Sequence, residues 1–374
     1  MEKNFFTLPS NFWKEKPISI GSIKVHLIWF DSMGAKSSCI LVKTPEISVL
    51  VDPGVASMQP SYPLSEEEKS KLRECALKCI LEASKEADII FISHYHYDHH
   101  TLPEKAEKIY RGKKLWIKNP NFWINYSQWK RSRLFLEQLI GAEKFEKIQI
   151  SFPPSVLNFL QIDPLDNLSI ARKKNYGSYQ KRKEELLERG KRELKKLIEK
   201  WKEGPCVEEE SLKRYKIYLA DGKSFQIGST KVKFSLPLFH GMEYDRLGWV
   251  IALVVERKGI KLLYTSDLQG PIIEDYAKWI VKEKPHILII DGPPTYLFGY
   301  MLNFINLKRS RDNLIYILDE LSPHLLIYDH HLLRDRHYQE RVLEVYEYAR
   351  KKGKKLLTAA EWYGYKPLIL QLAR

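Results

Sequence analysis

The segment at residues 93–100 has the residue types and the spacing of a metal-binding site. It follows an apolar stretch and contains the pattern His94-x-His96-x-Asp98-His99. His94 and His96 are two positions apart, so in an extended chain both imidazoles project from one side. Asp98 and His99 follow in a turn that can direct them toward a second point. Neutral imidazole and carboxylate groups suit zinc and similar divalent ions.

A surface cluster of histidines is the alternative to a metal site. With 11 His in 374 residues, the composition rarely produces this pattern by chance, so the alternative is weak. Tyr95 and Tyr97 would point to the other side of the chain, where packing is a more common role than chemistry. The segment therefore predicts a metal centre that needs further ligands from elsewhere in the chain.

Candidates for those ligands come directly after short apolar stretches that predict strands. They are Asp52, His240, Asp267 and the adjacent pair His330 and His331. A single His or Asp at such a place is usually a capping or turn residue. Several of them in one chain with the His-rich segment favour a shared site, because side chains from several strands converge at the carboxyl ends of those strands.

These residues appear in the order of the five motifs of the metallo-β-lactamase superfamily. The chain resembles that superfamily from about residue 24 to residue 358, apart from residues 151–216. It is more closely similar to an archaeal group of predicted metallo-hydrolases known as UPF0282. The matching phrases lie at residues 51–55, 92–100, 292–297 and 329–335. The group supplies no substrate, and the charged insertion departs from shorter members of the superfamily.

The resemblance implies an α+β fold, a four-layer αββα sandwich of two mixed β-sheets, with two divalent metal ions. The ligands that it implies are His94, His96 and His240 for one ion, Asp98, His99 and His330 for the other, and Asp267 for both. Asp52 would orient ligands from behind them. His331 is the alternative to His330, because an adjacent pair leaves the strand register open by one residue. Zn²⁺ is the expected ion, and Mn²⁺ or Fe²⁺ would suit the same donors.

A hydrolytic enzyme follows from this set of residues. Two such ions about 3.5–4 Å apart would supply hydroxide from a shared water near neutral pH. Asp98 would also steer this water, and Asp52 would hold the ligands in place. His331 and Arg334 would be left to meet the substrate. The oxygen-reducing di-iron branch of the superfamily resembles HxExD at this motif, whereas this chain has His96 at the Glu position, which favours hydrolysis over redox chemistry.

Apolar periodicity predicts the elements that must position these side chains. Strands are expected at residues 25–30, 39–42, 48–51, 88–93, 115–117, 231–236, 249–256, 261–265, 287–290, 325–328 and 355–358. Helices are expected at residues 65–86, from about 101, and at 125–140, 178–203, 273–284 and 340–351. Ser65 with Glu68 predicts a capping box for one of them. The order favours a single sandwich domain over residues 1–374, with a charged helical insertion at residues 151–216.

The chain is strongly basic, with a formal net charge of +14. Residues 172–202 carry thirteen Lys or Arg and only five Glu. A segment of this kind is most often a solvated helix, as in many heat-adapted proteins. It is also typical of a surface that binds a polyanion such as nucleic acid. The sequence leaves both interpretations open.

A phosphodiesterase, specifically a nuclease, is the first of three functions that fit these residues. It is supported by the basic insertion and by Lys130, Arg131 and Arg133, because phosphate contacts need cations. Aromatic side chains nearby would stack on bases. They are Trp123, Tyr126, Trp129, Tyr176 and Tyr179.

A hydrolase of small-molecule esters or lactones is the second function. The turn at residues 292–296, together with Arg246 or Arg334, would then form a pocket for an anionic substrate. A non-catalytic nucleic-acid-binding protein on a hydrolase scaffold is the third. The full set of metal ligands argues against this last function.

Cysteine usage and hydropathy predict a cytoplasmic protein. Cys39, Cys75, Cys79 and Cys206 are scattered and form no CxxC pair, which suits a reducing compartment. No stretch approaches the roughly 18 apolar residues that cross a bilayer. Residues 1–10 lack the basic and apolar regions of an export signal. We therefore expect no membrane partner.

Overall fold

Two β-sheets of seven strands each form the centre of the part of the chain that the computed structural model describes, which is residues 4–156, 160 and 162–372. The first sheet contains β1 (Ile18–Ile20), β2 (Ile23–Phe30), β3 (Ser38–Lys43), β4 (Ser48–Val51), β5 (Ile89–Ile92), β6 (Lys114–Ile117) and β9 (Ile217–Leu219), in that order. The second contains β10 (Ser224–Ile227), β11 (Thr230–Phe234), β14 (Leu253–Arg257), β15 (Ile260–Tyr264), β16 (Ile287–Asp291), β17 (Leu325–Asp329) and β18 (Leu356–Leu357).

Both sheets are mixed in the same way. From β1 to β4 and from β10 to β15 the neighbours are antiparallel, and the remaining neighbours in each sheet are parallel. Strand β5 is apolar throughout and buried, and β16 is apolar and buried up to its last residue, Asp291, as expected for parallel strands covered on both faces. The parallel halves bring the carboxyl ends of several strands to one edge of the sandwich, where a site can form.

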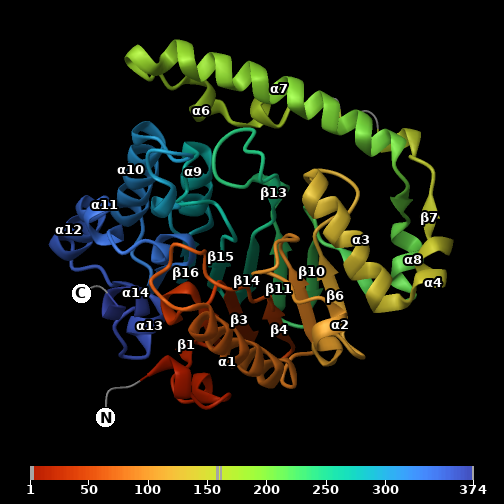
Figure 1. The fold of residues 1–374 in the computed structure, drawn as a ribbon, viewed down its shortest axis with the longest axis horizontal. Helices are drawn as coiled ribbons and strands as arrows, with labels where there is room; N and C mark the ends of the chain where they lie inside the picture. Colours follow the sequence, from red (N-terminus) through yellow and green to blue (C-terminus); the bar gives the residue numbers. More distant parts are fainter. Residues whose placement is uncertain (1–3, 157–159, 161, 373–374) are drawn as a thin grey trace.

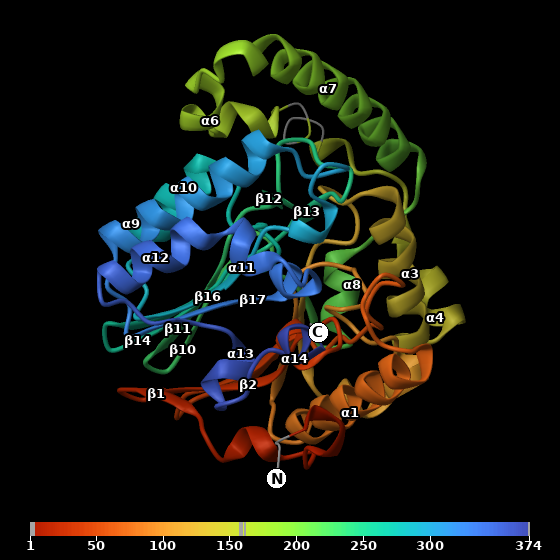
Figure 2. The same cartoon turned by 60° about the vertical axis from the view of Figure 1, so that its left-hand side comes forward.

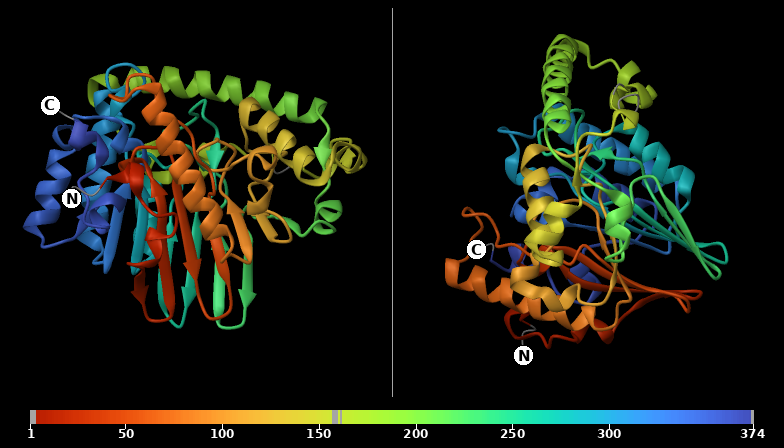
Figure 3. Two further views of the ribbon diagram at one scale, coloured as in Figure 1. Left: turned by 60° about the horizontal axis from the view of Figure 1, so that its bottom comes forward. Right: turned by 90° about the vertical axis from the view of Figure 1, so that its right-hand side faces the viewer.

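Helices cover the outer faces of the two sheets. The longer helices of the molecule are α1 (Glu66–Ser84), α3 (Tyr126–Ile140), α7 (Gln180–Glu203), α9 (Glu274–Glu283), α10 (Phe304–Glu320) and α12 (Leu343–Lys351). The shorter ones are α2 (Pro103–Ala106), α4 (Ala142–Lys147), α6 (Ser169–Lys173), α8 (Glu209–Lys213), α11 (Tyr338–Arg341), α13 (Ala359–Trp362) and α14 (Leu368–Leu372). Figure 2 shows α9, α10 and α12 outside the second sheet and α1 outside the first, and Figure 3 shows the two sheets packed face to face. The predicted αββα sandwich is confirmed.

Helix α1 forms where its local sequence signals indicate. The Ser65 side chain accepts a hydrogen bond from the Glu68 amide, and Glu68 returns one to the Ser65 amide, which completes the predicted capping box. Leu72, Ala76 and Ile80 recur at helical spacing and are buried against the first sheet. Burial of a leucine or isoleucine side chain contributes about 1.5–3 kcal/mol, so this stripe fixes the helix on the sheet.

Three of the differences from the prediction concern longer elements. The strand expected at 249–256 is split into β13 (Trp249–Val250) and β14, because the chain leaves a short ladder with β12 (Leu238–Phe239) to join the second sheet. The helix expected at 340–351 is split into α11 and α12. Helix α10 was not predicted at all, although Asn303 caps it and Leu307, Leu314 and Ile317 form a buried stripe at helical spacing.

The predicted insertion folds mainly into α7, with α6 before it and β8 (Cys206–Val207) after it, where β8 pairs with β7 (Gln149–Ile150). Residues 157–159 and 161 of the insertion lie outside the described residues, as do residues 1–3 and 373–374. Figure 1 shows α7 crossing one end of the sandwich, from the side of α10 to the side of α3. In the described residues, no helix is long and apolar enough to cross a membrane.

Candidate metal centre

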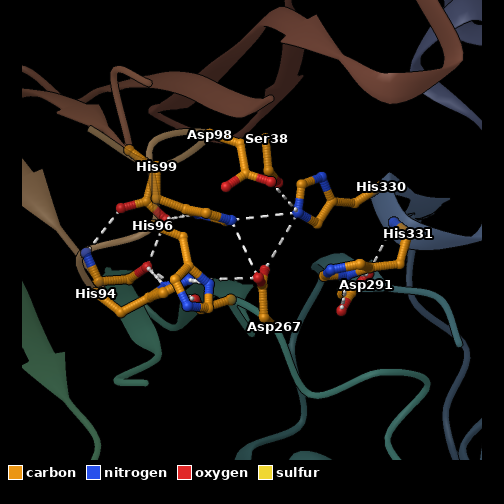
Figure 4. Close-up of polar contacts among 12 residues, drawn as sticks. Ser38, His94, His96, Asp98, His99, Asp267, Asp291, His330 and His331 are labelled. Carbon is orange, nitrogen blue, oxygen red and sulfur yellow. Dashed lines mark hydrogen bonds and ion pairs between the residues drawn. The ribbon is translucent and has the colours of Figure 1, made fainter. Parts of the chain in front are cut away.

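The candidate metal ligands meet at the edge of the sandwich where β4, β5, β15 and β17 end (Figure 4). Three residues at this edge have positive φ angles, Asp52 at 47°, Ser266 at 55° and His330 at 70°. Left-handed backbone in non-glycine residues costs about 1–3 kcal/mol each and is concentrated at functional sites. At these positions the chain turns just after a strand, at Asp52 after β4, at Ser266 after β15 and at His330 after β17.

One group of donors consists of three histidines and a carboxylate. His94 Nε2 lies 3.1 Å from His96 Nδ1 and 3.4 Å from Asp267 Oδ2. His240 Nε2 lies 3.1 Å from the same oxygen. The four donor atoms all lie within 4.8 Å of one another, which is the size of one coordination sphere.

A second group lies on the other side of Asp267. His99 Nε2 is 3.2 Å from His330 Nε2 and 3.1 Å from Asp267 Oδ2. His330 Nε2 is 3.5 Å from Asp267 Oδ1 and 3.8 Å from Asp98 Oδ2. Asp98, His99 and His330 again lie within 4.8 Å of one another. The carboxylate of Asp267 therefore reaches both groups, as Figure 4 shows.

These donors fit divalent cations by their geometry and by their unmet polar needs. Zn–N bonds of about 2.0–2.1 Å at a tetrahedral angle place two nitrogens about 3.3–3.4 Å apart. The nitrogen pairs at 3.1 and 3.2 Å are close to this value. In the described residues, His240 Nε2 and both oxygens of Asp267 are buried without a well-aligned hydrogen bond. Buried groups of this kind cost about 1–3 kcal/mol each unless a cation binds them.

Electrostatics hold Asp267, His94 and His96 in their ligating forms. Burial opposes ionisation of Asp267, but the neighbouring His99, His330 and His94 lower its pKa well below the usual range. Burial also lowers the pKa of His94 to about 4, so this imidazole is neutral at physiological pH. Burial lowers the pKa of His96 strongly as well. A carboxylate beside neutral imidazoles is the form that binds a metal ion. In the second group, burial opposes protonation, but Asp267 and Asp52 raise the pKa of His99 to about 10, so this imidazole must release a proton when an ion binds.

Asp52 lies behind the second group and accepts several hydrogen bonds. Its Oδ2 is 2.8 Å from His99 Nδ1 and accepts from Ser93 Oγ at 2.6 Å and from the Tyr264 hydroxyl at 2.8 Å. Its Oδ1 accepts from the Ser93 amide at 2.7 Å. With Nδ1 of His99 engaged, Nε2 is directed toward Asp267. This is the orienting arrangement that metal-bound histidines usually have.

Asp31 has the same place behind His330, and the sequence analysis did not find it. Its Oδ1 lies 2.9 Å from His330 Nδ1, and its Oδ2 accepts from Arg334 Nε at 2.5 Å. Arg334 Nη2 then donates to Asp98 Oδ2 at 2.9 Å. Burial favours the neutral acid, but Arg334 and His330 lower the pKa of Asp31 below its usual range. Arg334 is therefore buried between two carboxylates. The sequence had led us to expect that Arg334 would meet the substrate, but in the structure it is not free to do so.

The adjacent histidines have different partners. His330 faces Asp98, His99 and Asp267, whereas His331 Nδ1 lies 3.0 Å from both oxygens of Asp291. Both imidazoles are buried, and a ring nitrogen of His331 still lies within 4.8 Å of donor atoms of Asp267 and His330. His331 thus borders the metal centre with its own carboxylate partner.

Further residues around the motif have packing or supporting roles. Tyr95 is buried and donates its hydroxyl to the Lys118 carbonyl at 2.6 Å. Tyr97 remains 39% exposed beneath the guanidinium of Arg131, which lies 4.5 Å from its ring centre. Gln128 on α3 reaches toward the site, with Nε2 3.5 Å from His96 Nε2. These contacts place α3 directly beside the first group of donors.

The turn expected to line a pocket for a small anionic substrate lies near one of the two arginines named for it. Arg334 lies 5.9 Å from the Tyr296 ring, in the turn at residues 292–296. Arg246, by contrast, is exposed on the loop after His240 and contacts Met301. Of the two candidate arginines, Arg334 lies beside the turn, and its guanidinium is engaged by Asp31 and Asp98.

The residues that the sequence analysis overlooked differ in how visible they were. Asp31 and Asp291 each follow or end an apolar strand, the signal that identified Asp52 and Asp267. The same rule would have found both. Gln128 has no such signal, because its position depends only on how α3 packs against the loop.

Comparisons with known proteins identify the family. Residues 34–100 match the sequence model of the metallo-beta-lactamase superfamily. A UPF0282 protein of Methanopyrus kandleri is 32% identical over 364 residues, which cover 94% of this chain and 98% of that protein. A UPF0282 protein of Methanocaldococcus jannaschii is 31% identical over 363 residues, which cover 94% of this chain and 95% of that protein.

Among solved structures, the metallo-beta-lactamase fold protein YhfI from Bacillus subtilis is similar to this chain. The TM-score is 0.39 and the sequence identity 13%, with 92% of this chain and 96% of that chain covered. The curated relatives share about a third of their residues with the chain along nearly its whole length. The chain therefore belongs to the UPF0282 family of archaeal proteins and has the metallo-β-lactamase fold.

Proposed function

We propose that this protein is a metal-dependent hydrolase that cleaves phosphodiester bonds of nucleic acid at a centre of two divalent ions, with zinc as the expected ion. The observation that carries the proposal is the position of Asp267, whose two carboxylate oxygens reach both groups of histidine and aspartate donors. Such a carboxylate is suited to bridge two ions. A pair of ions bound there would supply hydroxide near neutral pH and stabilise charge that develops on the phosphoryl group.

The residues of the chain would divide the remaining work among them. Asp52 and Asp31 fix the orientation of His99 and His330, so that the donors need not reorganise when an ion binds. Arg334 holds the Asp98 carboxylate in place. These contacts keep the metal-ligating side chains in fixed positions, which is the contribution that a preorganised site makes to catalysis.

His331 is the residue that we assign to the substrate side of the centre. Asp291 accepts a hydrogen bond from Nδ1–H of His331 in the tautomer that this pairing favours. Nε2 of the same ring then carries the lone pair and can accept a proton. His331 borders the metal ligands but makes none of the contacts with Asp98 and His99 that His330 makes. This position suits a residue that meets the substrate or a water molecule.

A phosphodiester is favoured over a neutral ester by the charges near the second group of donors. Lys36 is half-buried beside this group. Burial is the largest effect on the pKa of Lys36 and lowers it, the nearby Arg334 lowers it further, and Asp98 raises it. Cations beside a reacting centre favour an anionic substrate. The net charge of +14 acts in the same direction at longer range.

We also expect a cytoplasmic protein, because all four cysteines are free.

Hydrolysis of bis-p-nitrophenyl phosphate tests the proposal. The protein loaded with Zn²⁺ or Mn²⁺ should release p-nitrophenol, and His96→Ala and Asp267→Ala should reduce release to the background rate. His337→Ala is the matched control, since this exposed histidine pairs with Glu340 away from the centre. Turnover that survives in both site variants would overturn the site. Turnover of p-nitrophenyl esters or lactones without any of the phosphodiester would overturn the substrate class.

A further inference from the structure

An exposed aromatic platform lies between α3 and α7. Tyr126, the first residue of α3, is 48% exposed, and its ring is nearly parallel to that of Trp129, at 17° with centres 6.2 Å apart. The ammonium groups of Lys130 and Lys200 lie 4.5 and 4.9 Å from the Tyr126 ring centre. We call these four residues the Tyr126 platform. A shallow cavity of about 360 Å³ opens beside it.

The platform has a rigid base. The guanidinium of Arg133 lies 3.3 Å from the Trp129 ring centre and is buried beneath it. Arg133 donates to the Pro120 carbonyl at 2.8 Å and to the Pro205 carbonyl at 2.6 Å, which joins α3 to the chain that follows α7. Arg133 is therefore a structural cation. The sequence had led us to expect a free phosphate ligand at this position. A fixed ring loses little entropy when a second ring stacks on it.

The other aromatic residues that the sequence offered are not available for stacking. Trp123 is buried in a group of tryptophans. Tyr176 is covered by the cations of Arg309 and Lys183. Tyr179 is half-buried and accepts a hydrogen bond from Asn303. The structure thus reduces a diffuse compositional signal to one place.

Two cations without a carboxylate partner among the described residues lie at the platform. Several cations of α7 are paired with glutamates three residues away, among them Arg182, Lys196 and Lys202. Lys130 and Lys200 have no carboxylate partner among the described residues, and both rest on the Tyr126 ring instead. Lysine is flexible, so each ammonium can move from the ring to a phosphate when a base occupies the ring.

Helix α3 also connects the platform to the metal centre. Gln128, which reaches toward His96, is two residues after Tyr126 and so about 160° around the helix from it. The two faces meet at the amino-terminal end of α3, where Asn125 donates to the Arg246 carbonyl at 2.9 Å. The Arg246 backbone therefore lies beside this end of the helix, while its exposed side chain contacts Met301. A helix is only about 10–12 Å across, a distance that a few nucleotides span.

We infer that the Tyr126 platform binds a base of a single-stranded nucleic acid whose backbone passes the amino-terminal end of α3 to reach the metal centre. The path of the strand toward the metal centre rests on the proposed function. The inference adds that the substrate is single-stranded and that the platform holds it. A base stacks on the tyrosine ring, and Lys130 and Lys200 contact the adjacent phosphates. The chemistry is common to RNA and DNA strands.

A single strand fits the platform better than the other polyanions. An acidic peptide would use the two lysines but would leave the exposed ring without a partner. A duplex would present phosphates but hides the faces of its bases, so that stacking on Tyr126 would require unpairing. Only an unpaired strand uses an aromatic face and its flanking cations together.

Binding of a fluorescein-labelled 12-nucleotide oligouridylate, measured by anisotropy in excess EDTA, tests the platform without turnover. Tyr126→Ala should weaken binding about 5- to 100-fold, since one stacked base is lost, and Tyr126→Phe should bind within about twofold of the wild type. The double variant Lys130→Ala/Lys200→Ala should lower the slope of log affinity against log salt by about 1.4. Oligothymidylate should give the same pattern, and a duplex should bind more weakly.

A matched control removes the same charge from the same surface. Lys181 and Lys195 are exposed lysines of α7 outside the platform. The variant Lys181→Ala/Lys195→Ala should keep oligouridylate affinity within about twofold and should keep the full effect of Tyr126→Ala. Equal losses from the two lysine pairs would show diffuse electrostatic binding and would overturn the platform. So would unchanged binding in Tyr126→Ala, or a polyglutamate peptide that competes as well as the oligonucleotide.

The platform and the proposed function can fail separately. Hydrolysis of bis-p-nitrophenyl phosphate reports on the metal centre, whereas oligouridylate binding in EDTA reports on the platform without turnover. Hydrolysis of this compound without Tyr126-dependent strand binding would remove the platform and leave the hydrolase. Strand binding through Tyr126 without any metal-dependent hydrolysis would remove the hydrolase and leave the platform.

Discussion

His330 and His331 are adjacent in the chain, yet the fold gives them different chemistry. The positive φ of His330 turns its ring toward Asp98, His99 and Asp267, and Asp31 holds its Nδ1. Asp291 holds the ring of His331 instead. The two rings therefore cannot exchange roles without a rearrangement of the backbone.

Metal content after substitution should separate these two histidines. We expect Zn²⁺-loaded His330→Ala, after gel filtration, to retain about one ion fewer per chain than wild type, because His330 supplies a donor to the second group and its loss leaves Asp98 and His99 with too few. His331→Ala should retain the wild-type metal content and lose turnover. Inductively coupled plasma mass spectrometry measures the ions. Loss of an ion from His331→Ala, with none lost from His330→Ala, would reverse the assignment.

A buried charge network joins α7, α9 and α10 to the loop that follows His240. Arg309 on α10 donates to Glu243 at 2.7 Å and to Glu274 at 2.7 Å, and Lys183 on α7 donates to Glu243 at 2.5 Å. Glu243 is three residues from His240, so this network also supports one metal ligand. Burial opposes the ionisation of Glu243, but Arg309 and Lys183 lower its pKa to about 2.

Removal of Arg309 should be costly at neutral pH and less costly in acid. We expect Arg309→Met to lower the free energy of unfolding by about 3–5 kcal/mol at pH 7, since two buried carboxylates each lose one of their cationic partners. The folded-state pKa of Glu243 is below its ordinary value of 4.5, so its ionised form stabilises the fold above pH 4.5 and loses that contribution as pH falls toward 2. The difference between variant and wild type should therefore shrink below pH 4.5.

Urea unfolding of the two proteins at pH 7 and at pH 3.5 measures this effect. Lys308→Met on the same helix is the control, because Lys308 pairs with Asp312 at an exposed position and should change stability little. A difference for Arg309→Met that is constant or grows in acid would show that the network does not act through ionised glutamates.

Helix α7 lies across the end of the sandwich and is attached near both of its ends (Figure 1). Lys183 is anchored in the charge network, and Trp201 donates to the Ile124 carbonyl at 3.2 Å while packing among buried aromatics. Between them, Gly190 lies against Tyr244, where a Cβ atom would come within 2.4 Å of the tyrosine side chain. We infer that residues 151–216 form part of one domain with the sandwich.

Hydrogen exchange can distinguish an integral helix from a mobile arm. Because α7 is attached at both ends, its amides on the buried face, such as that of Leu194, should show protection within about tenfold of the amides of α10. Exchange of the α7 amides at close to the rates of an unstructured peptide would show an independent arm. If the contact between Gly190 and Tyr244 holds the helix, Gly190→Leu should raise the exchange rates of the α7 amides.

Local chemistry determined what could be predicted from the order of residues. The pattern from His94 to His99 and the capping box at Ser65 depend on neighbours a few positions away, so their spacing is already visible in the chain. Asp52 and Asp267 could be predicted because strand ends converge. The same rule applies to Asp31 and Asp291, which the sequence also contained.

Contacts between distant segments decided the remainder. The choice between His330 and His331 depends on Asp31 and Asp291, which lie about 300 and 40 positions away. The availability of Tyr126 for stacking, and the loss of Arg133 to the interior, depend on how α3 packs against α7. Neither property has a local signature, because burial and partner choice arise only when segments far apart in the chain are brought together.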